Sequence, residues 1–324
     1  MVKPVSGDTA SWQPEVLPGL PLGDWQATCT TLHLWTQIAG KIRLALAPMQ
    51  NHWWQAALYL TPRGLTTSPM PYQTETVQID FDFIDHLLQI QTSRGASEEV
   101  QLTARPVADF YHDVMKALRS LGIELEIWTV PVEIDERIPF DEDTTHTAYD
   151  PDAARRFWSA LAQVDRVMKI FRGRFRGKAS PVHFFWGSFD LCASRFSGAR
   201  APLIDHAYHV ARYVMEEAYC DEVSSCGFWP GQGLGEPAFY AYHYPEPEGY
   251  SEAEIQPAEA YYHPGFKEFI LPYEAVRASA RWETAVLSFL QSTYEAGANL
   301  AKWDRGRFEQ SPLIKGGRSS DSNP

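Results

Sequence analysis

Two segments of this chain carry the same pattern of side chains. Residues 52–60 read HWWQAALYL and residues 183–191 read HFFWGSFDL. Histidine aligns with histidine, two aromatic residues with two aromatic residues, two small residues with two small residues, and leucine with leucine. An arginine follows each segment, Arg63 in the first case and Arg195 in the second. We interpret this repetition as two related halves that enclose a cleft between them.

The wider sequence pattern predicts helices and antiparallel strands in both halves. Apolar residues at helical spacing predict helices over residues 25–46, 107–121, 152–175, 206–219 and 281–303. Alternating residues between turns predict strands over residues 53–61, 64–69, 76–83, 86–93, 98–103, 124–130, 182–191, 193–197, 224–229, 238–244, 259–263 and 267–271. The order indicates an α+β protein in which each half is an antiparallel meander sheet with flanking helices. As architecture only, it resembles a helix-grip or TATA-binding-protein-like tandem.

Changes in composition suggest where the parts of the chain begin and end. Residues 1–22 are rich in Pro and Gly and read as an extended N-terminal arm. Residues 23–131 form the first α+β half, residues 132–151 an acidic connector, and residues 152–303 the second half. We expect residues 304–324, which end in small and polar residues, to be a disordered tail.

Charge and cysteine usage exclude several classes of partner. The formal net charge is −13, and an acidic surface repels phosphate backbones, so we expect no nucleic-acid partner. No stretch approaches the roughly 18 apolar residues that a membrane helix needs, so we expect no membrane partner. The 4 cysteines lack C-x-x-C spacing and secretory context, which favours reduced thiols and a cytoplasmic protein. Nucleotide-binding glycine loops and serine-hydrolase motifs are absent from the sequence.

The alternation of residues in both repeated segments predicts a ligand pocket. One face of each expected strand mixes aromatic rings with amides, hydroxyls and carboxylates, whereas a solvated face more usually carries Lys, Glu and Thr. We expect three rings to stack on a ligand: Trp53, Tyr59 and Trp186. We expect three polar groups to orient it, Gln55, Asp82 and Asp190, and two cations to contact any anionic group, Arg63 and Arg195. The same face also fits a plain solvent face or a dimer interface.

Four residues are candidates for catalysis. His52 and His183 occupy matching positions and fit a pair of ligands or acid–base groups, or two structural histidines. Asp80 shares a strand face with Asp82, which suits a cation site, acid–base work or a solvated edge. Cys226 precedes a glycine among hydroxyl residues and fits either a reactive thiolate or a small buried side chain.

One helical segment has a spacing typical of metal ligands. His206 and His209 fall on one face of the expected helix with Glu216 and Cys220. The apolar residues of that helix lie on the opposite face, which leaves this group in solvent. The sequence therefore predicts no particular metal and no particular cofactor.

Several blocks of the sequence resemble an uncharacterised bacterial family, domain of unknown function 5996. The blocks are residues 32–37, 40–44, 51–54, 63–69, 79–83, 183–191 and 225–231, and the resemblance extends from about Leu20 to Trp303. It implies a single cytoplasmic module covering nearly the whole chain. It assigns no catalytic residue.

Together these patterns predict a protein that binds a small polar molecule in a cleft between two pseudo-symmetric halves. If the protein is an enzyme, it transforms this molecule. One alternative is a non-catalytic interaction or dimerisation module that uses the aromatic face to form a homodimer. Another is a metal-dependent enzyme that uses histidines and carboxylates from both halves. The substrate and the reaction do not follow from the sequence.

Overall fold

Two antiparallel sheets form the centre of the molecule. The computed structural model describes residues 17–203 and 210–309 of the 324 in the chain. The first sheet has the strand order β1 (Tyr59–Leu60), β2 (Gly64–Thr66), β4 (Glu75–Asp82), β5 (Leu87–Thr92) and β6 (Ser97–Gln101), and β3 (Met70–Tyr72) also pairs with β4. The second has the order β11 (Tyr261–His263), β12 (Glu268–Pro272), β10 (Ala238–Tyr244), β9 (Asp221–Trp229), β8 (Asp190–Arg200) and β7 (His183–Phe185).

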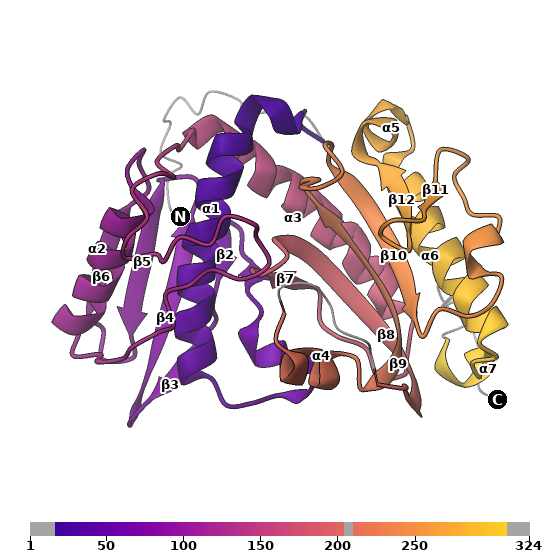
Figure 1. The fold of residues 1–324 in the computed structure, drawn as a ribbon, viewed down its shortest axis with the longest axis horizontal. Helices are drawn as coiled ribbons and strands as arrows, with labels where there is room; N and C mark the ends of the chain where they lie inside the picture. The colour runs from indigo at the N-terminus through magenta and orange to yellow at the C-terminus, as the bar shows by residue number, and fades with distance from the viewer. Residues whose placement is uncertain (1–16, 204–209, 310–324) are drawn as a thin grey trace, which may run out of the picture.

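The two sheets meet at one backbone bridge. Leu58 and Phe184 exchange two N–H···O hydrogen bonds, each 2.8 Å long, next to β1 and β7. The sheets therefore lie edge to edge, as Figure 1 shows, and the bridge joins the two segments that share a sequence pattern.

Helices cover these sheets and fill the space between the halves. They are α1 (Leu22–Leu46), α2 (Val107–Ser120), α3 (Pro151–Gly173), α4 (Arg212–Ala218), α5 (Tyr273–Ala278), α6 (Trp282–Leu300) and α7 (Arg305–Phe308), with 3₁₀ segments η1 (Asn51–Ala56) and η2 (Tyr250–Glu252). Helix α3 packs on α1, α6 and β8 and runs between the two halves (Figure 1). No helix in the described part of the chain combines the length and the apolar character needed to cross a membrane.

Local sequence explains where the two long helices begin. Asp150 precedes α3, and its carboxylate accepts hydrogen bonds from the backbone N–H groups of Asp152 and Ala153, while Pro151 occupies the first helical position. Helix α1 has Asp24 in its first turn and Arg43 in its last, which suits the helix dipole. Helix α1 is buried on nearly all sides, so its polar residues must find partners inside the protein.

The predicted α+β class with two antiparallel sheets is confirmed, but the two repeated segments adopt different backbone conformations. Residues 51–56 form η1 instead of a strand, with His52 and Trp53 at φ 56° and 60°. The second segment is a strand only as far as Phe185, and residues 186–189 form a turn. The first difference follows from α4, because Val214 and Ala218 supply carbonyl oxygens that bind the side chains of Trp53 and His52.

Another difference concerns residues 124–130, which form no strand. Lys41 of α1 donates hydrogen bonds to the carbonyl oxygens of Trp128, at 3.0 Å, and of Val130. Backbone groups satisfied by a helix side chain do not need a neighbouring strand. The predicted helix over residues 206–219 is described only as α4, and His206 and His209 lie outside the described residues.

Candidate functional site

A cavity of about 750 Å³ lies against the second sheet. Alternate residues of β8 and β10 face it, while α3 and α6 pack on the sheet from the other side. The C-terminal end of α1, η1, α4 and the segment of residues 126–137 form the remaining walls. Both repeated segments contribute, the first through residues 52–54 and 56 and the second through residues 185–188 and 190. The cavity is therefore assembled from both halves of the chain.

Trp186 forms one wall of this cavity. Its indole ring lies against Gly40 of α1, where a Cβ would come within 2.2 Å of a ring atom. The indole N–H donates a 2.7 Å hydrogen bond to the carbonyl oxygen of Ala56. Because one side of the ring packs on Gly40 and its N–H is hydrogen-bonded, the position of the ring is fixed without a ligand.

Helix α1 also fixes the segment that carries Glu133. Gln37 exchanges hydrogen bonds of 2.8 and 2.9 Å with the backbone oxygen and N–H of Val132. The neighbouring Glu133 has a positive φ of 55°, a conformation that costs free energy for a non-glycine residue and occurs often at functional sites. Its carboxylate lies against Gly187, where a Cβ would be 2.2 Å from Oε1. A strained residue is thus held over a glycine at the cavity wall.

The carboxylate of Glu133 has no partner within the described residues. No hydrogen bond or ion pair from residues 17–203 or 210–309 reaches it. The residue is exposed to solvent and lines the cavity. Desolvation by the surrounding protein, followed by the charge of the nearby Asp190 carboxylate, raises its pKa to about 7.

Asp190 lies deeper in the same cavity and is fully hydrogen-bonded. Its two oxygens accept hydrogen bonds from the hydroxyls of Ser188 and Tyr240. Burial raises the pKa of Asp190 to about 6, although both hydrogen bonds favour the ionised form. Glu268 of β12 is also close to Asp190, and burial followed by repulsion from Asp190 raises its pKa to about 8. Glu133 and Glu268 thus both lie close enough to Asp190 for its charge to raise their pKa values.

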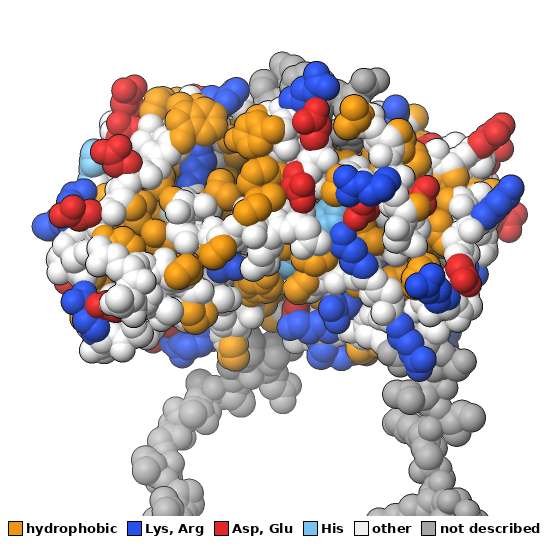
Figure 2. Space-filling view, turned by 90° about the horizontal axis from the view of Figure 1, so that it is seen from below, with side chains coloured by type: hydrophobic (Ala, Val, Ile, Leu, Met, Phe, Trp, Pro, Cys, Tyr) orange, Lys and Arg blue, Asp and Glu red, His pale blue; other side chains and the backbone are white. Residues whose placement is uncertain are grey.

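The mouth of the cavity has a hydrophobic rim. Leu44, Trp128 and Tyr213 are exposed to solvent and also line the cavity. Figure 2 shows hydrophobic side chains gathered over the lower face of the molecule, with histidine atoms visible among them. The Lys41 ammonium lies 4.4 Å from the centre of the Trp128 ring, which holds that ring near the opening.

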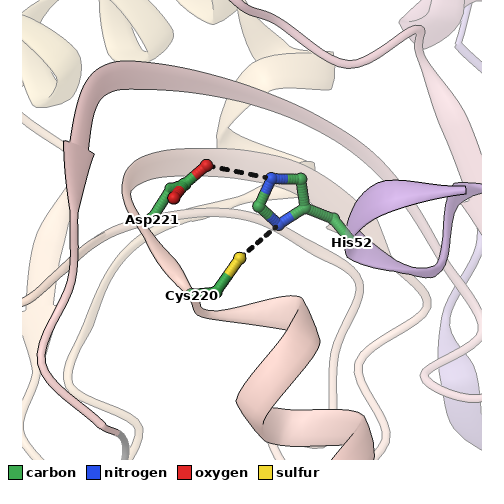
Figure 3. A group of neighbouring side chains, drawn as sticks. All are labelled: His52, Cys220 and Asp221. Carbon is green, nitrogen blue, oxygen red and sulfur yellow. Dashed lines mark hydrogen bonds and ion pairs between the residues drawn. The ribbon is translucent and has the colours of Figure 1, made fainter.

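A second group of side chains lies beside the cavity, where η1 meets the start of β9. His52, Cys220 and Asp221 each offer a ligand atom, and these atoms lie within 4.8 Å of one another. Figure 3 shows the imidazole of His52 between the other two side chains, with Asp221 Oδ2 3.5 Å from Nε2 and Cys220 Sγ 3.9 Å from Nδ1. Among the described residues, these three have the spacing that a metal ion would need.

Hydrogen bonds around His52 define its protonation state. A carbonyl oxygen can only accept, so Nδ1, 3.1 Å from the oxygen of Ala218, carries the proton. Nε2 then accepts a 2.6 Å hydrogen bond from the Lys178 ammonium, which also donates to Asp221 at 2.8 Å. Burial, followed by the charge of Lys178, lowers the pKa of His52. Lys178 therefore occupies the position between nitrogen and carboxylate that a metal ion would take.

Cys220 is not activated by these neighbours. Burial and then the charge of Asp221 raise its pKa, so the thiol keeps its proton at neutral pH. The pKa of Asp221 is lowered, because hydrogen bonds from Lys178 and Arg200 outweigh the effect of burial. This group consequently holds η1 against the second half of the chain as an ion-paired cluster.

Of the residues singled out from the sequence, four line the cavity: His52, Trp53, Trp186 and Asp190. Trp53 is fixed by a 3.0 Å hydrogen bond from its indole N–H to Val214 O. The structure therefore brings together aromatic and acidic residues from both repeated segments, although Trp186 lies in a turn and not in the expected strand.

The other predicted site residues of the first half lie outside this cavity. Arg63 pairs with Asp82 and Asp85 at an exposed turn, and Asp80 accepts hydrogen bonds from Gln78. Gln55 is buried and satisfied within its own loop by Gln50 and Met49. Tyr59 lines a separate cavity of about 210 Å³.

Two predicted residues of the second half point away from this cavity on their strands, and a third shares a sheet face with lining residues but is not among them. Arg195 is buried on the helix side, 3.5 Å from the centre of the Phe171 ring. Cys226 is also buried, and desolvation raises the pKa of its thiol. His183 is fully buried in β7 opposite Cys192, and neither ring nitrogen has a hydrogen-bond partner within the described residues. The rings of His183 and His52 both contact the ring of Trp54, and no direct contact between the two histidines is seen. The strand alternation places Ser225, and not Cys226, at the cavity.

Sequence reasoning missed Glu133, Tyr240 and Tyr242. The two tyrosines alternate with Phe239, Ala241 and His243 along β10, and this pattern could have placed both on one sheet face. Glu133 lies in a segment without regular structure, which we interpreted only as an acidic connector. Its position depends on the contacts with α1, and no local pattern predicts them.

Comparison with known proteins places the chain in a family. The sequence model of the family of unknown function DUF5996 matches residues 17–310, so the chain belongs to this family and the resemblance noted in its sequence blocks is confirmed. No curated protein and no solved structure matches the chain. The family assigns no activity, so the function has to be argued from the cavity itself.

Proposed function

We propose that this protein binds a small polar molecule in the cavity at the second sheet. The observation that carries the proposal is the carboxylate of Glu133, which has no partner among the described residues and faces an aromatic-walled cavity of about 750 Å³. Small-molecule sites are typically apolar cavities of roughly 300–1,000 Å³ with a few well-placed polar groups. The Glu133 carboxylate is exposed within the cavity and is available to accept hydrogen bonds from a ligand.

The lining suggests a role for each group. Trp186 and Trp53 offer ring surfaces for the apolar part of the ligand. Asp190, Ser188 and Tyr240 form a connected set of hydrogen-bonding groups that can orient its polar part. If the protein transforms its ligand, Glu133 and Asp190 are the acid–base pair to test, because their raised pKa values of about 7 and about 6 suit proton transfer near neutral pH.

We further propose that the two halves are pseudo-repeats. Each begins with a long helix followed by an antiparallel sheet, and the two sheets meet at Leu58 and Phe184 inside the repeated segments. The supply of cavity residues by both segments supports this proposal.

A metal-dependent enzyme is the second candidate function, favoured by the group of His52, Cys220 and Asp221. In such a metal site, Nδ1 of His52 keeps its proton and its hydrogen bond to the carbonyl oxygen of Ala218, and Nε2 binds the metal. Lys178 would have to withdraw before a metal could bind. Zinc titration of the wild type by calorimetry tests this: binding that is lost in Cys220→Ser supports it, and an unchanged titration rejects it.

Native mass spectrometry of freshly purified protein, with elemental analysis of the same sample, tests the main proposal. We expect a retained or added small molecule that is lost in Trp186→Ala, with circular dichroism confirming that the variant is folded. A bare dimer that dissociates in Trp128→Ala would instead support an interaction module that uses the hydrophobic rim.

A further inference from the structure

We propose that the ligand of this cavity is a small organic cation, such as a protonated amine, that binds between Glu133, Asp190 and the aromatic walls. This inference rests on the proposed function, since it assumes that the cavity binds a ligand. It goes further by assigning the charge and the chemical class of that ligand.

The first argument is the balance of charge around the carboxylates. The charge of Asp190, another acid, raises the pKa of Glu133, and it raises the pKa of Glu268 in the same way. Neutral hydroxyls satisfy Asp190. Within the described residues none of these three carboxyl groups forms an ion pair with a cation, so their negative charges repel one another. A ligand that brings a positive charge removes this repulsion, whereas an anionic ligand would increase it.

The cations that line the cavity are engaged elsewhere. Lys41 directs its ammonium to the carbonyl oxygens of Trp128 and Val130, and burial and then the charge of Arg137 lower its pKa to about 8. Arg137 donates from Nε to the carbonyl oxygen of Pro131 at 3.3 Å. Both groups hold the segment of residues 126–137 and leave the carboxylates unpaired.

The second argument is the chemistry of the walls. Trp186 and Tyr240 line the cavity next to Asp190, and aromatic faces attract cations, most strongly where water is excluded. An ammonium group also has N–H donors for both Glu133 oxygens. The combination of ring faces and carboxylates therefore fits an ammonium group better than a metal ion. Within the described residues, Glu133 and Asp190 do not belong to any group of ligand atoms spaced for a metal.

A matched pair of probes tests the charge directly. Benzylamine and benzyl alcohol have nearly the same shape and differ in whether the polar end is a cation. We expect calorimetry or ligand-observed NMR at about pH 8 to show that benzylamine binds more tightly by roughly tenfold or more, the range typical of hydrogen bonds to charged groups. Benzylamine stays protonated over this range, because simple amines titrate near about pH 10.

Matched variants locate the interaction. Glu133→Gln should abolish the preference for benzylamine, while Glu126→Gln, which removes the same charge from another cavity-lining residue, should keep it. The preference should also weaken roughly tenfold as the pH falls from about 8 to about 6, because Glu133 is then protonated. The titratable or charged groups facing Glu133 are Asp190 on β8, Tyr219 after α4, Lys41 on α1, and Glu126 and Arg137 on its own segment.

The outcomes separate this inference from the proposed function. Equal binding of both probes, lost in Trp186→Ala, would leave the proposed function standing and overturn the assignment of a cation. A preference for benzylamine that survives in Glu133→Gln would overturn the assignment as well. Failure of both probes to bind the wild type would contradict the assignment and count against the cavity as a ligand site.

Discussion

The raised pKa of Asp190 predicts that this residue destabilises the folded protein at neutral pH. Its side chain is 5% exposed, and burial raises its pKa from 3.8 to about 6. A carboxyl group with a raised pKa keeps its proton in the folded state while the unfolded chain has already released it. The titration of Asp190 therefore leaves the free energy of unfolding unchanged below about pH 4 and lowers it as the pH rises towards 6.

The size of the effect follows from the difference between the two pKa values. One pKa unit corresponds to about 1.4 kcal/mol, so the full penalty is about 3 kcal/mol above pH 7. Between about pH 4 and about pH 7, between roughly 2 and 3 kcal/mol should develop. Asp190→Asn removes the titration and keeps an oxygen to accept from Tyr240 or Ser188. The free energy of unfolding of the Asp190→Asn variant, relative to that of the wild type, should therefore rise by roughly 2 to 3 kcal/mol between about pH 4 and about pH 7.

Urea unfolding of both proteins at several pH values measures this difference. Asp82→Asn is a control of opposite sign: burial opposes ionisation of Asp82, but the hydrogen bond from Arg63 and two backbone N–H bonds outweigh it and lower the pKa. This variant should lose stability relative to the wild type as the pH rises. A stability difference for Asp190→Asn that stays constant with pH, or that turns against the variant, would refute the reasoning.

Three further substitutions probe how the cavity is built. Gly187→Ala places a Cβ against the Glu133 carboxylate, so benzylamine binding should fall at least tenfold by calorimetry with little change in melting temperature, because a flexible side chain can move aside; retained binding contradicts the assigned place of Glu133. Lys41→Met removes the donors that hold the cavity segment, so hydrogen exchange there should accelerate roughly tenfold or more; unchanged protection contradicts this. Lys178→Met removes the second-largest cause of the lowered pKa of His52, so NMR titration should show that pKa rising, and a fall or no change would count against the ion-paired cluster.

The long helices and the longer strands could be predicted from the sequence because their periodicity is local, whereas the short helices α5 and α7 were not, and α7 lies in the predicted disordered tail. Helix α2 was expected over residues 107–121 and spans Val107–Ser120, and β5 was expected over residues 86–93 and spans Leu87–Thr92. The conformation of residues 51–56 could not be predicted in this way. Their aromatic and small residues suit a strand, and contacts with α4, more than 150 residues further along the chain, favour a 3₁₀ segment instead.

The candidate site was predictable only where strand alternation decides the direction of a side chain. Asp190 faces the cavity together with the alternate residues that follow it in β8, whereas Trp186 lies in a turn where alternation does not decide the direction of the side chain. The repeat suggested Arg195 and the neighbouring hydroxyl and glycine residues suggested Cys226, but strand alternation places both against the helices. Glu133 required knowledge of tertiary contacts, since Gln37 holds the neighbouring Val132 across 95 positions in the sequence.

Crystallography with soaked small polar compounds tests the central claim most directly, because it shows where a ligand lies. We predict electron density in the cavity beside Trp186, with a polar group within hydrogen-bonding distance of Glu133 or Asp190. Compounds that bind elsewhere on the surface, while the cavity contains only water, would contradict the account.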